Sequence, residues 1–242
     1  MGNPFKWRHF SGEVILWGVR WYCKYGVSYR ELEEMLAERG IQVDHTTLYR
    51  WVQRYAPELE RRTRWFRRRG GRQSWRVDET YIRVKGEWRY LYRALDSFGN
   101  TIDFFLSARR NIYAAKRFLG KALRRGRRGT EVSAINTDRN PTYATAIAAL
   151  RKRGALPEAT EHRQVKYLNN GIECDHGKIK RLLKPGLGFQ SMKTAYATLK
   201  GIEVMRMFRK GQFSHRYHAG RPDEVSFINQ LFGLFGDRGA TR

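Results

Sequence analysis

Apolar side chains recur at helical spacing through the first sixty residues. In residues 13–25 they occupy one face of a helix, at Ile15, Leu16, Val19, Tyr22 and Cys23. Gly26 ends this segment, and Ser28 stands three residues before Glu31, the spacing of a capping box that begins a second helix. Asp44 is suited to cap the start of a third helix. These signals predict three short helices in succession.

The third predicted helix has two distinct faces. Its apolar side chains follow the i, i+3, i+4, i+7 rule and are expected to face inward: Leu48, Trp51, Val52 and Tyr55. The other side carries Thr46, Tyr49, Arg50 and Gln53. Their hydroxyl, guanidinium and amide groups can contact phosphates and base edges in a major groove. The pattern predicts a helix-turn-helix DNA-binding domain over residues 1–60; the alternative is a plain three-helix bundle with a solvated outer face.

From residue 73 the pattern changes to that of strands. Segments rich in β-branched and aromatic residues, with turns between them, predict an antiparallel meander at 74–84, 88–97 and 101–108. The later segments predict a helix at 112–123, a strand at 131–138, a helix at 143–154, a short strand at 161–167 and helices at 170–183 and 191–210. This is the element order of the ribonuclease H-like fold. We therefore expect an α/β domain over residues 73–210, with a mixed five-stranded sheet and flanking helices.

The charge of the chain points to a polyanionic partner. Lys and Arg number 48 against 23 Asp and Glu, which gives a net charge of +25. A pI near 10.6 is most simply explained by nucleic acid binding. Residues 61–72 hold seven arginines among twelve residues, and we interpret them as a basic linker between the domains. Arg67, Arg68 and Arg69 are expected to follow a DNA backbone, unless the linker is only a solvated tether.

Several classes of protein are excluded by the same sequence. The two cysteines, Cys23 and Cys174, have no paired Cys/His spacing, which argues against a zinc finger and against a disulfide framework. No GxxxxGK[ST] motif is present, so ATP is not implied. No segment approaches the roughly 20 apolar residues that span a membrane, and the first ten residues do not form a signal peptide. We expect a cytoplasmic protein associated with the nucleoid.

Two acids occupy notable places in the predicted sheet. Asp78 lies within an otherwise apolar and aromatic strand, where a carboxylate is costly to bury unless it is paired or binds a metal. The alternative is a strand residue that faces solvent. Asp138 ends the fourth strand beside Asn140 and Pro141. Taken singly, Asp138 is most simply a turn residue.

A third acid comes from the helix at 170–183. Ile172, Ile179 and Leu183 define its apolar stripe. At about 100° per residue, Glu173 lies beside this stripe on the side of Gly177, Lys180 and Lys184. Asp175 falls on the other side, where it would cap the helix or pair locally. We therefore favour Glu173 as the third acid; the alternative is a surface charge without a function.

Three acids on these elements suggest a metal-dependent reaction at phosphorus. Carboxylate oxygens suit Mg²⁺ or Mn²⁺. Two such ions can hold the attacking and the leaving oxygen of an in-line displacement. No covalent enzyme intermediate is then required.

The sequence resembles the transposases of insertion-sequence family six, compact bacterial and archaeal DDE enzymes that form cointegrates by replicative transposition. The stretches "VDHTTLYRWVQRYAPELE", "VDETYIRV", "INTD" and "NNGIECDHGKIKR" carry the resemblance, which covers about residues 3–211. It implies that Asp78, Asp138 and Glu173 are the catalytic triad and bind the metal. It also implies that Lys180 contacts DNA phosphate near the active site.

The resemblance implies metal-assisted cleavage at the element's ends and transfer of the freed strand into target DNA. The partners would be the terminal repeats, the target DNA and at least a second copy of the chain, because two ends must be held together. Residues 211–242 are a tail, either a short apolar helix used for packing or dimer contact, or a poorly ordered end. One rival is a nuclease of the same fold without strand transfer. Another is a non-enzymatic helix-turn-helix regulator, which would have no need of Asp78.

Overall fold

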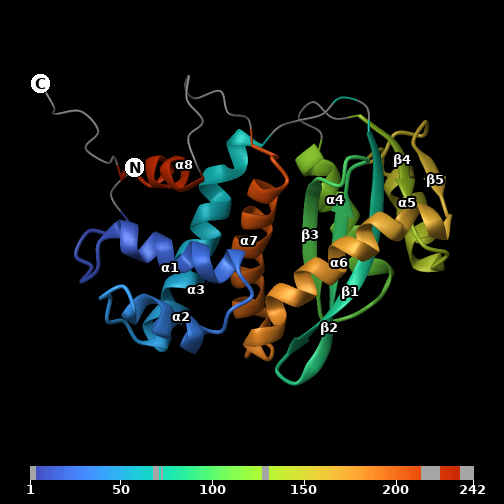
Figure 1. The fold of residues 1–242 in the computed structure, drawn as a ribbon. Coiled ribbons are helices and arrows are strands. Elements are labelled where there is room, and N and C mark those ends of the chain that lie inside the picture. The colour runs from blue at the N-terminus through green and yellow to red at the C-terminus, as the bar shows by residue number, and fades with distance from the viewer. Residues whose placement is uncertain (1–3, 68–70, 72, 127–130, 214–223, 235–242) are drawn as a thin grey trace, which may run out of the picture. The chain divides into compact units, whose positions relative to one another are not determined.

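The chain forms two compact units in a computed structural model, which describes residues 4–67, 71, 73–126, 131–213 and 224–234 (Figure 1). The first unit combines Met1–Arg68 with Lys193–Arg242, and the second is Arg69–Met192. The helical unit is therefore built from both ends of the chain. Within the described residues, no helix has the length and apolar character needed to cross a membrane.

The N-terminal helices form as the pattern predicts. They are α1 (Gly12–Lys24), α2 (Tyr29–Ala37) and α3 (His45–Thr63). Ser28 and Glu31 make the reciprocal contacts of a capping box at the start of α2. Asp44 accepts hydrogen bonds from the backbone N–H groups of Thr46 and Thr47 at the start of α3. Helix α3 continues beyond residue 60 into the segment that we assigned to the linker, and the 3-10 helix η1 (Arg64–Phe66) follows it.

Two C-terminal helices complete the helical unit. They are α7 (Met192–Arg209) and α8 (Glu224–Leu231). Gly201 of α7 packs so closely that an added Cβ would lie 2.5 Å from Cys23 Sγ. Glu224 of α8 forms ion pairs with Arg20 at 2.9 Å and Lys24 at 2.8 Å. We expected α7 in the sheet domain at 73–210, but it groups with the N-terminal helices. The tail was expected to be either a packed helix or a poorly ordered end. Residues 224–231 form the packed helix.

The second unit contains a five-stranded sheet in the order β3-β2-β1-β4-β5. Its strands are β1 (Gln73–Val84), β2 (Glu87–Leu95), β3 (Thr101–Ser107), β4 (Val132–Asn136) and β5 (Glu161–Arg163). Strands β1, β2 and β3 are antiparallel neighbours, whereas β4 runs parallel to β1 and β5 parallel to β4. This mixed sheet with flanking helices confirms the predicted ribonuclease H-like architecture. The strand that we predicted at 161–167 is shorter, because η2 (Lys166–Asn169) takes its second half.

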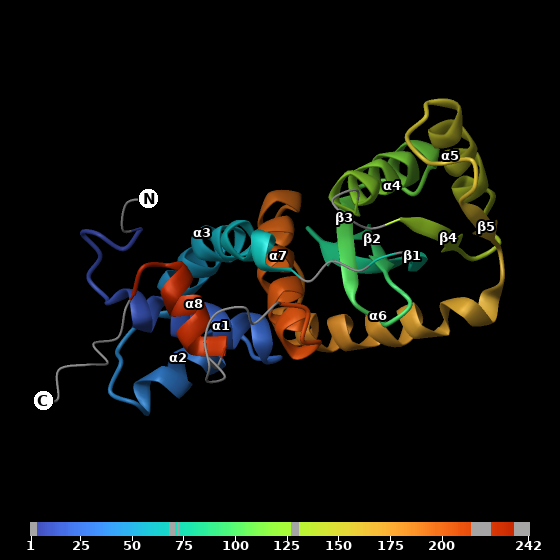
Figure 2. The same cartoon turned by 90° about the horizontal axis from the view of Figure 1, so that it is seen from above.

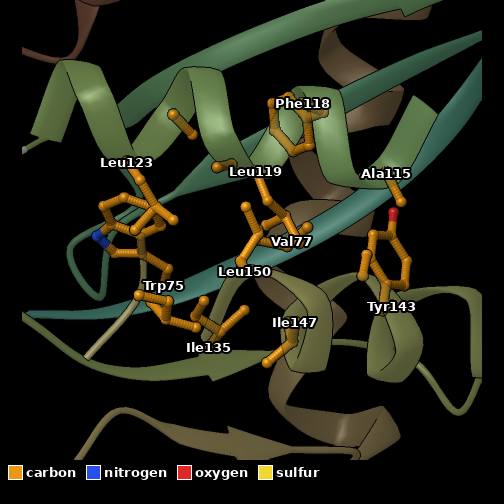
Figure 3. Close-up of a cluster of buried hydrophobic side chains, with 14 of the residues drawn as sticks. Trp75, Val77, Ala115, Phe118, Leu119, Leu123, Ile135, Tyr143, Ile147 and Leu150 are labelled. Atoms are coloured by element: carbon orange, nitrogen blue, oxygen red, sulfur yellow. The ribbon is translucent and has the colours of Figure 1, made fainter. Parts of the chain in front are cut away.

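The two faces of the sheet are covered differently. Helices α4 (Ile112–Gly126) and α5 (Pro141–Lys152) lie on one face, and α6 (Asn170–Leu183) lies on the other (Figure 2). The apolar core fills the space under α4 and α5, where Trp75 and Val77 of β1 meet side chains such as Phe118 and Ile147 (Figure 3). Side chains alternate along a strand, and Trp75 and Val77 face α4 and α5. Arg76 and Asp78 of the same strand therefore face α6.

Candidate active site

The fold brings Asp78 and Asp138 to the same end of two neighbouring strands. Strands β1 and β4 are parallel, and Arg76 lies opposite Asn136. Asp78 and Asp138 each come two residues further along, so the register places them side by side. Asp138 lies just beyond the end of β4, not within the strand as we expected. Its Oδ1 accepts a hydrogen bond from the Asn140 N–H at 3.1 Å, in the manner of a turn aspartate.

Helix α6 carries Glu173 close enough to Asp78 for its charge to affect the pKa of that acid. Glu173 is exposed near the start of the helix, whereas the Asp78 side chain is only 17% exposed. Burial is the main cause that raises the pKa of Asp78 to about 7. The neighbouring charge of Glu79, and those of Asp138 and Glu173, add to the rise in this pKa. Asp138 and Glu173 therefore each lie close enough to Asp78 for their charges to raise its pKa.

This electrostatic excess suits a cation. The acids offer hard oxygen donors of the kind that divalent ions such as Mg²⁺ accept, so the chemistry of the donors fits. Across the described residues, however, no three His, Cys, Asp or Glu side chains already converge as a metal-binding group.

Polar contacts hold α6 on the sheet. Its buried stripe consists of Ile172, Asp175, His176 and Ile179. Asp175 Oδ2 lies 2.6 Å from a guanidinium nitrogen of Arg93, whose side chain is fully buried in β2. Arg93 lies directly opposite Asp78 in the β1–β2 register. His176 Nδ1 lies 3.7 Å from Asp78 Oδ2, so two consecutive residues of α6 reach the surroundings of Asp78.

The approach to α6 is fixed by Arg76. Its Nε donates to the Leu168 carbonyl at 2.9 Å, and its NH1 donates to the carbonyls of Asp96 at 3.2 Å and Ser97 at 3.1 Å. Arg76 thus joins the β2–β3 turn to the segment that leads into α6. Since Glu173 follows within the first turn of the helix, these contacts help to set its position.

Asp175 does not have the role that we expected. We predicted a helix cap or a local pair, but its partner is Arg93, eighty-two positions earlier in the chain. Arg93 and His176 were not among the predicted site residues. The spacing of Asp175 and His176 from Ile172, three and four residues, marks them as part of the buried face, and this signal is present in the sequence. The partner on β2 could not be identified from spacing.

A second polar network lies on the opposite face of the sheet. Glu79 is buried and accepts hydrogen bonds from Arg110 and from the hydroxyl of Tyr143. Burial, followed by the Glu79 charge, raises the pKa of Tyr143 well above its ordinary value, so it remains a donor. A guanidinium nitrogen of Arg110 also lies 4.0 Å from Asp138 Oδ2. Arg110 therefore connects the buried Glu79 with Asp138.

The predicted basic residues of α6 remain available. Lys180 and Lys184 are exposed, and Lys180 follows Glu173 by seven residues, which places both on one side of the helix. Lys184 follows the last residue of α6 as its C-cap. Cations at this end are also favoured by the helix dipole.

The predicted reading face of α3 is only partly free. Thr46 and Arg50 are exposed, as that interpretation requires. The Tyr49 ring instead packs edge-on against Tyr29, with the centroids 5.6 Å apart. The Gln53 amide donates to the Thr198 hydroxyl of α7 at 2.9 Å. The face therefore does not project all four side chains into solvent, because α2 and α7 engage two of them.

The basic linker also differs from a free tether where it is described. A guanidinium nitrogen of Arg67 lies 3.3 Å from Glu60 Oε1, and the Arg67 side chain is only 15% exposed. Arg68 and Arg69 lie outside the described residues. Arg67 is therefore paired with Glu60 and is not solvated as a free tether would be.

Comparison with known proteins identifies close sequence relatives. A family model described as a DDE domain matches residues 72–212. The transposase for insertion sequence-like element IS431mec of Staphylococcus aureus is 39% identical over 93% of this chain and 98% of its own length. The transposase for insertion sequence element IS257 in transposon Tn4003, also from Staphylococcus aureus, is 38% identical over the same shares.

Solved structures give weaker likenesses. A chain of the simian T-cell lymphotropic virus intasome in complex with a PP2A regulatory subunit aligns with a TM-score of 0.40 and 20% identity, over 54% of this chain and 49% of that chain. The HTLV-2 integrase catalytic core domain in complex with magnesium, in its trimeric form, aligns with a TM-score of 0.41 and 18% identity, over 53% and 81%.

The raised pKa of Asp78 predicts how the stability of the metal-free protein depends on pH. A carboxyl whose folded pKa lies above its unfolded value contributes stability that is complete below pH 3.8 and is lost as pH rises through about 7. Asp78→Asn cannot ionise, so its melting temperature relative to the wild type should rise between pH 5 and pH 8 in EDTA. Thermal melts across this range test the expectation, and a constant difference would contradict it.

The Arg93–Asp175 pair predicts a second result. Asp175→Asn removes the carboxylate charge that lies 2.6 Å from the buried Arg93 guanidinium and should lower the free energy of unfolding by about 3–5 kcal/mol in a urea titration. The double variant Arg93→Met with Asp175→Leu should recover most of that loss. Cys174→Ala, an exposed change on the same helix, should stay within about 0.5 kcal/mol of wild type. If Asp175→Asn unfolds at the wild-type urea concentration, the pair does not stabilise α6.

Proposed function

The chain belongs to the DDE transposases of insertion-sequence family six, and we propose that Asp78, Asp138 and Glu173 are its catalytic triad. The observation that supports this assignment is that Asp138 and Glu173, from separate elements, both lie close enough to the buried Asp78 to raise its pKa, in addition to burial and Glu79. Such a concentration of negative charge is costly for a fold unless it serves a positively charged ligand.

The proposed ligands of the site are two Mg²⁺ or Mn²⁺ ions, held by Asp78, Asp138 and Glu173. When bound, such ions supply Lewis acidity at the attacking and leaving oxygens of a phosphodiester. The chain's own residues provide the rest. We propose that the Arg93–Asp175 pair holds α6 on the sheet, so that Glu173 can join the strand acids, and that Arg110 restrains Asp138. Lys180 neutralises phosphate charge on the Glu173 side of the helix.

The proposed reaction has two displacements at phosphorus. In the first, a water oxygen attacks the phosphodiester at the element's end, and the strand leaves as a free 3′-hydroxyl. In the second, that hydroxyl attacks a target phosphodiester, and a target 3′-oxygen leaves. The number of phosphodiester bonds is conserved in the second step, so no external energy source such as ATP is needed. A nuclease of the same fold would stop after the first step, so joined product separates the two functions.

The helical unit is proposed to read the terminal repeats. Thr46 and Arg50 are exposed at the start of α3 and are the best placed for base or phosphate contacts. Tyr49 and Gln53 are proposed to support this surface through their contacts with Tyr29 and Thr198. Arg67, Arg68 and Arg69 remain candidates for contact with the DNA backbone. For Arg67 this requires exchange of its Glu60 partner for a phosphate.

The proposed working assembly is a homodimer or a higher oligomer. Each chain has one set of the three acids and one helix-turn-helix, whereas transposition must hold two element ends together. A closed symmetric assembly satisfies this requirement with identical subunits. We propose that the assembly acts on DNA in the cytoplasm, at the nucleoid.

The triad assignment predicts the effect of Glu173→Gln. The exposed substitution should change stability by no more than about 0.5 kcal/mol. Mg²⁺-dependent nicking at the element end should collapse, because an amide oxygen is a poor substitute for a carboxylate beside a divalent ion. Lys180→Ala should slow nicking without abolishing it, while Lys178→Ala, on another side of α6, should have a smaller effect. Normal nicking by folded Glu173→Gln would remove Glu173 from the triad.

The α3 contacts predict different outcomes for two neighbouring residues. Arg50→Ala should weaken binding to terminal-repeat DNA more than to random DNA, with about 1–3 kcal/mol of lost discrimination for a base-edge contact. Gln53→Ala should mainly lower thermal stability, because it removes a hydrogen bond within the helical unit. Binding curves for both DNAs, combined with melts, separate the two effects. Equal loss of discrimination in both variants would show that Gln53 also reads DNA.

A further inference from the structure

We propose that the outer end of the β1–β2 hairpin is a stacking platform for unpaired bases of the DNA strand beside the cut. The platform consists of Tyr81, Arg83, Trp88 and Tyr90. This inference rests on the proposed function, because it concerns how DNA lies next to the three acids. It adds a contact surface that is separate from the reading helix α3.

The register of the hairpin places the four side chains on one face. Tyr81 lies opposite Tyr90, and Arg83 lies opposite Trp88. The Tyr81 and Tyr90 rings are 5.4 Å apart between centroids, and the Arg83 guanidinium lies 5.6 Å from the centre of the Trp88 ring. Cross-strand neighbours share a face, so these contacts form a continuous row of rings with an arginine at its outer end.

Tyr90 is partly buried and packs against the core, whereas the rest of the row projects beyond it. Further along the same face, Val77 and Tyr92 are buried under α4 and α5. Beyond them the side chains emerge: Tyr81 is 43% exposed and Trp88 is 61% exposed. Strand β1 is asymmetric here, since Ile82 and Val84 on its other face remain buried. Large rings that stay in solvent next to a complete core are typical of binding surfaces.

The row leads toward Asp138 along the face of the sheet opposite Asp78 and α6. Glu79 lies two residues before Tyr81 on the same face, and it accepts a hydrogen bond from Arg110. Arg110 in turn reaches within 4.0 Å of Asp138 Oδ2. A strand whose phosphate lies at Asp138 can therefore follow Arg110 and then the hairpin. None of the four platform residues is acidic, and the nearby Glu87 forms an ion pair with Arg89. The platform residues therefore do not repel a phosphate.

The chemistry of the row favours unpaired bases over a duplex. Aromatic side chains stack on a base only when its flat face is free, and this contact is tolerant of sequence. Arginine adds attraction to the phosphates and can itself stack. A duplex would present its sugar–phosphate backbone, for which lysines and arginines suffice without rings. DNA next to a transposon cut becomes single-stranded when the strands separate, which supplies the proposed ligand.

The test compares two DNA probes that share one terminal repeat. One probe is a blunt duplex, and the other carries a single-stranded extension of ten thymidines past the cut position. Binding is measured by fluorescence anisotropy with the full chain in Ca²⁺ or EDTA, so that no cleavage occurs. Trp88→Ala and Tyr81→Ala should each weaken binding of the extended probe by about tenfold. Both should bind the blunt duplex like wild type, and Trp88→Phe should restore most of the loss.

Phe98→Ala is the matched control, because Phe98 is 82% exposed in the turn at the other end of β2. It should bind both probes like wild type. Equal losses on both probes would assign the hairpin to duplex contact, and unchanged binding of folded Trp88→Ala and Tyr81→Ala would assign it to a protein partner. Either outcome overturns the proposal. Glu173→Gln should keep the preference for the extended probe while it fails to nick, so a failed triad assignment is recognised separately.

Discussion

The buried ion pair between Arg93 and Asp175 is the contact on which the arrangement of the acids depends. An apolar interface would let α6 adjust by small shifts, since hydrophobic contacts have no direction. The ion pair instead joins the Arg93 guanidinium on β2 to the Asp175 carboxylate on α6, and so fixes the position of the helix. Because Arg93 lies opposite Asp78 and Asp175 is two residues from Glu173, one contact ties the strand acid to the helix acid. Hydrophobic replacements of buried ion pairs are often as stable, so this contact is better explained by specificity of position than by stability.

The two faces of the sheet are packed in different ways. Under α4 and α5, apolar packing supplies the cohesion of the unit. Under α6, charged groups such as Arg76, Arg93 and Asp78 occupy the interface. One face can therefore carry a repulsive set of carboxylates, because the other face supplies the compensating free energy. This division is typical of functional sites, where local rules of stability are broken and the rest of the fold compensates.

Sequence patterns predicted those features of the fold that are set by residues close together in the chain. The cap at Ser28, the helix at 170–183 and the sheet's element order follow from periodicity and turn residues, and the structure has them. The partners of polar side chains did not follow. Gln53 and Thr198 are 145 positions apart, and nothing in the spacing of either helix indicates that they meet. For the same reason the sequence could identify each acid separately as a candidate. The role of Arg93 and the packing of α7 against the N-terminal helices became clear only from the folded chain.

The helical unit is closed by a segment that is synthesised after the entire sheet unit. A nascent chain on the ribosome has α1, α2 and α3 early, but it lacks the helix that contacts Gln53, Cys23 and Ala56. Domains usually fold as they emerge, N-terminal part first. Here the N-terminal helices cannot bury the surface that packs against α7 until α7 has been synthesised. A truncated translation product would therefore expose that surface. Assembly of the helical unit is thereby coupled to prior synthesis of the sheet unit that carries the acids.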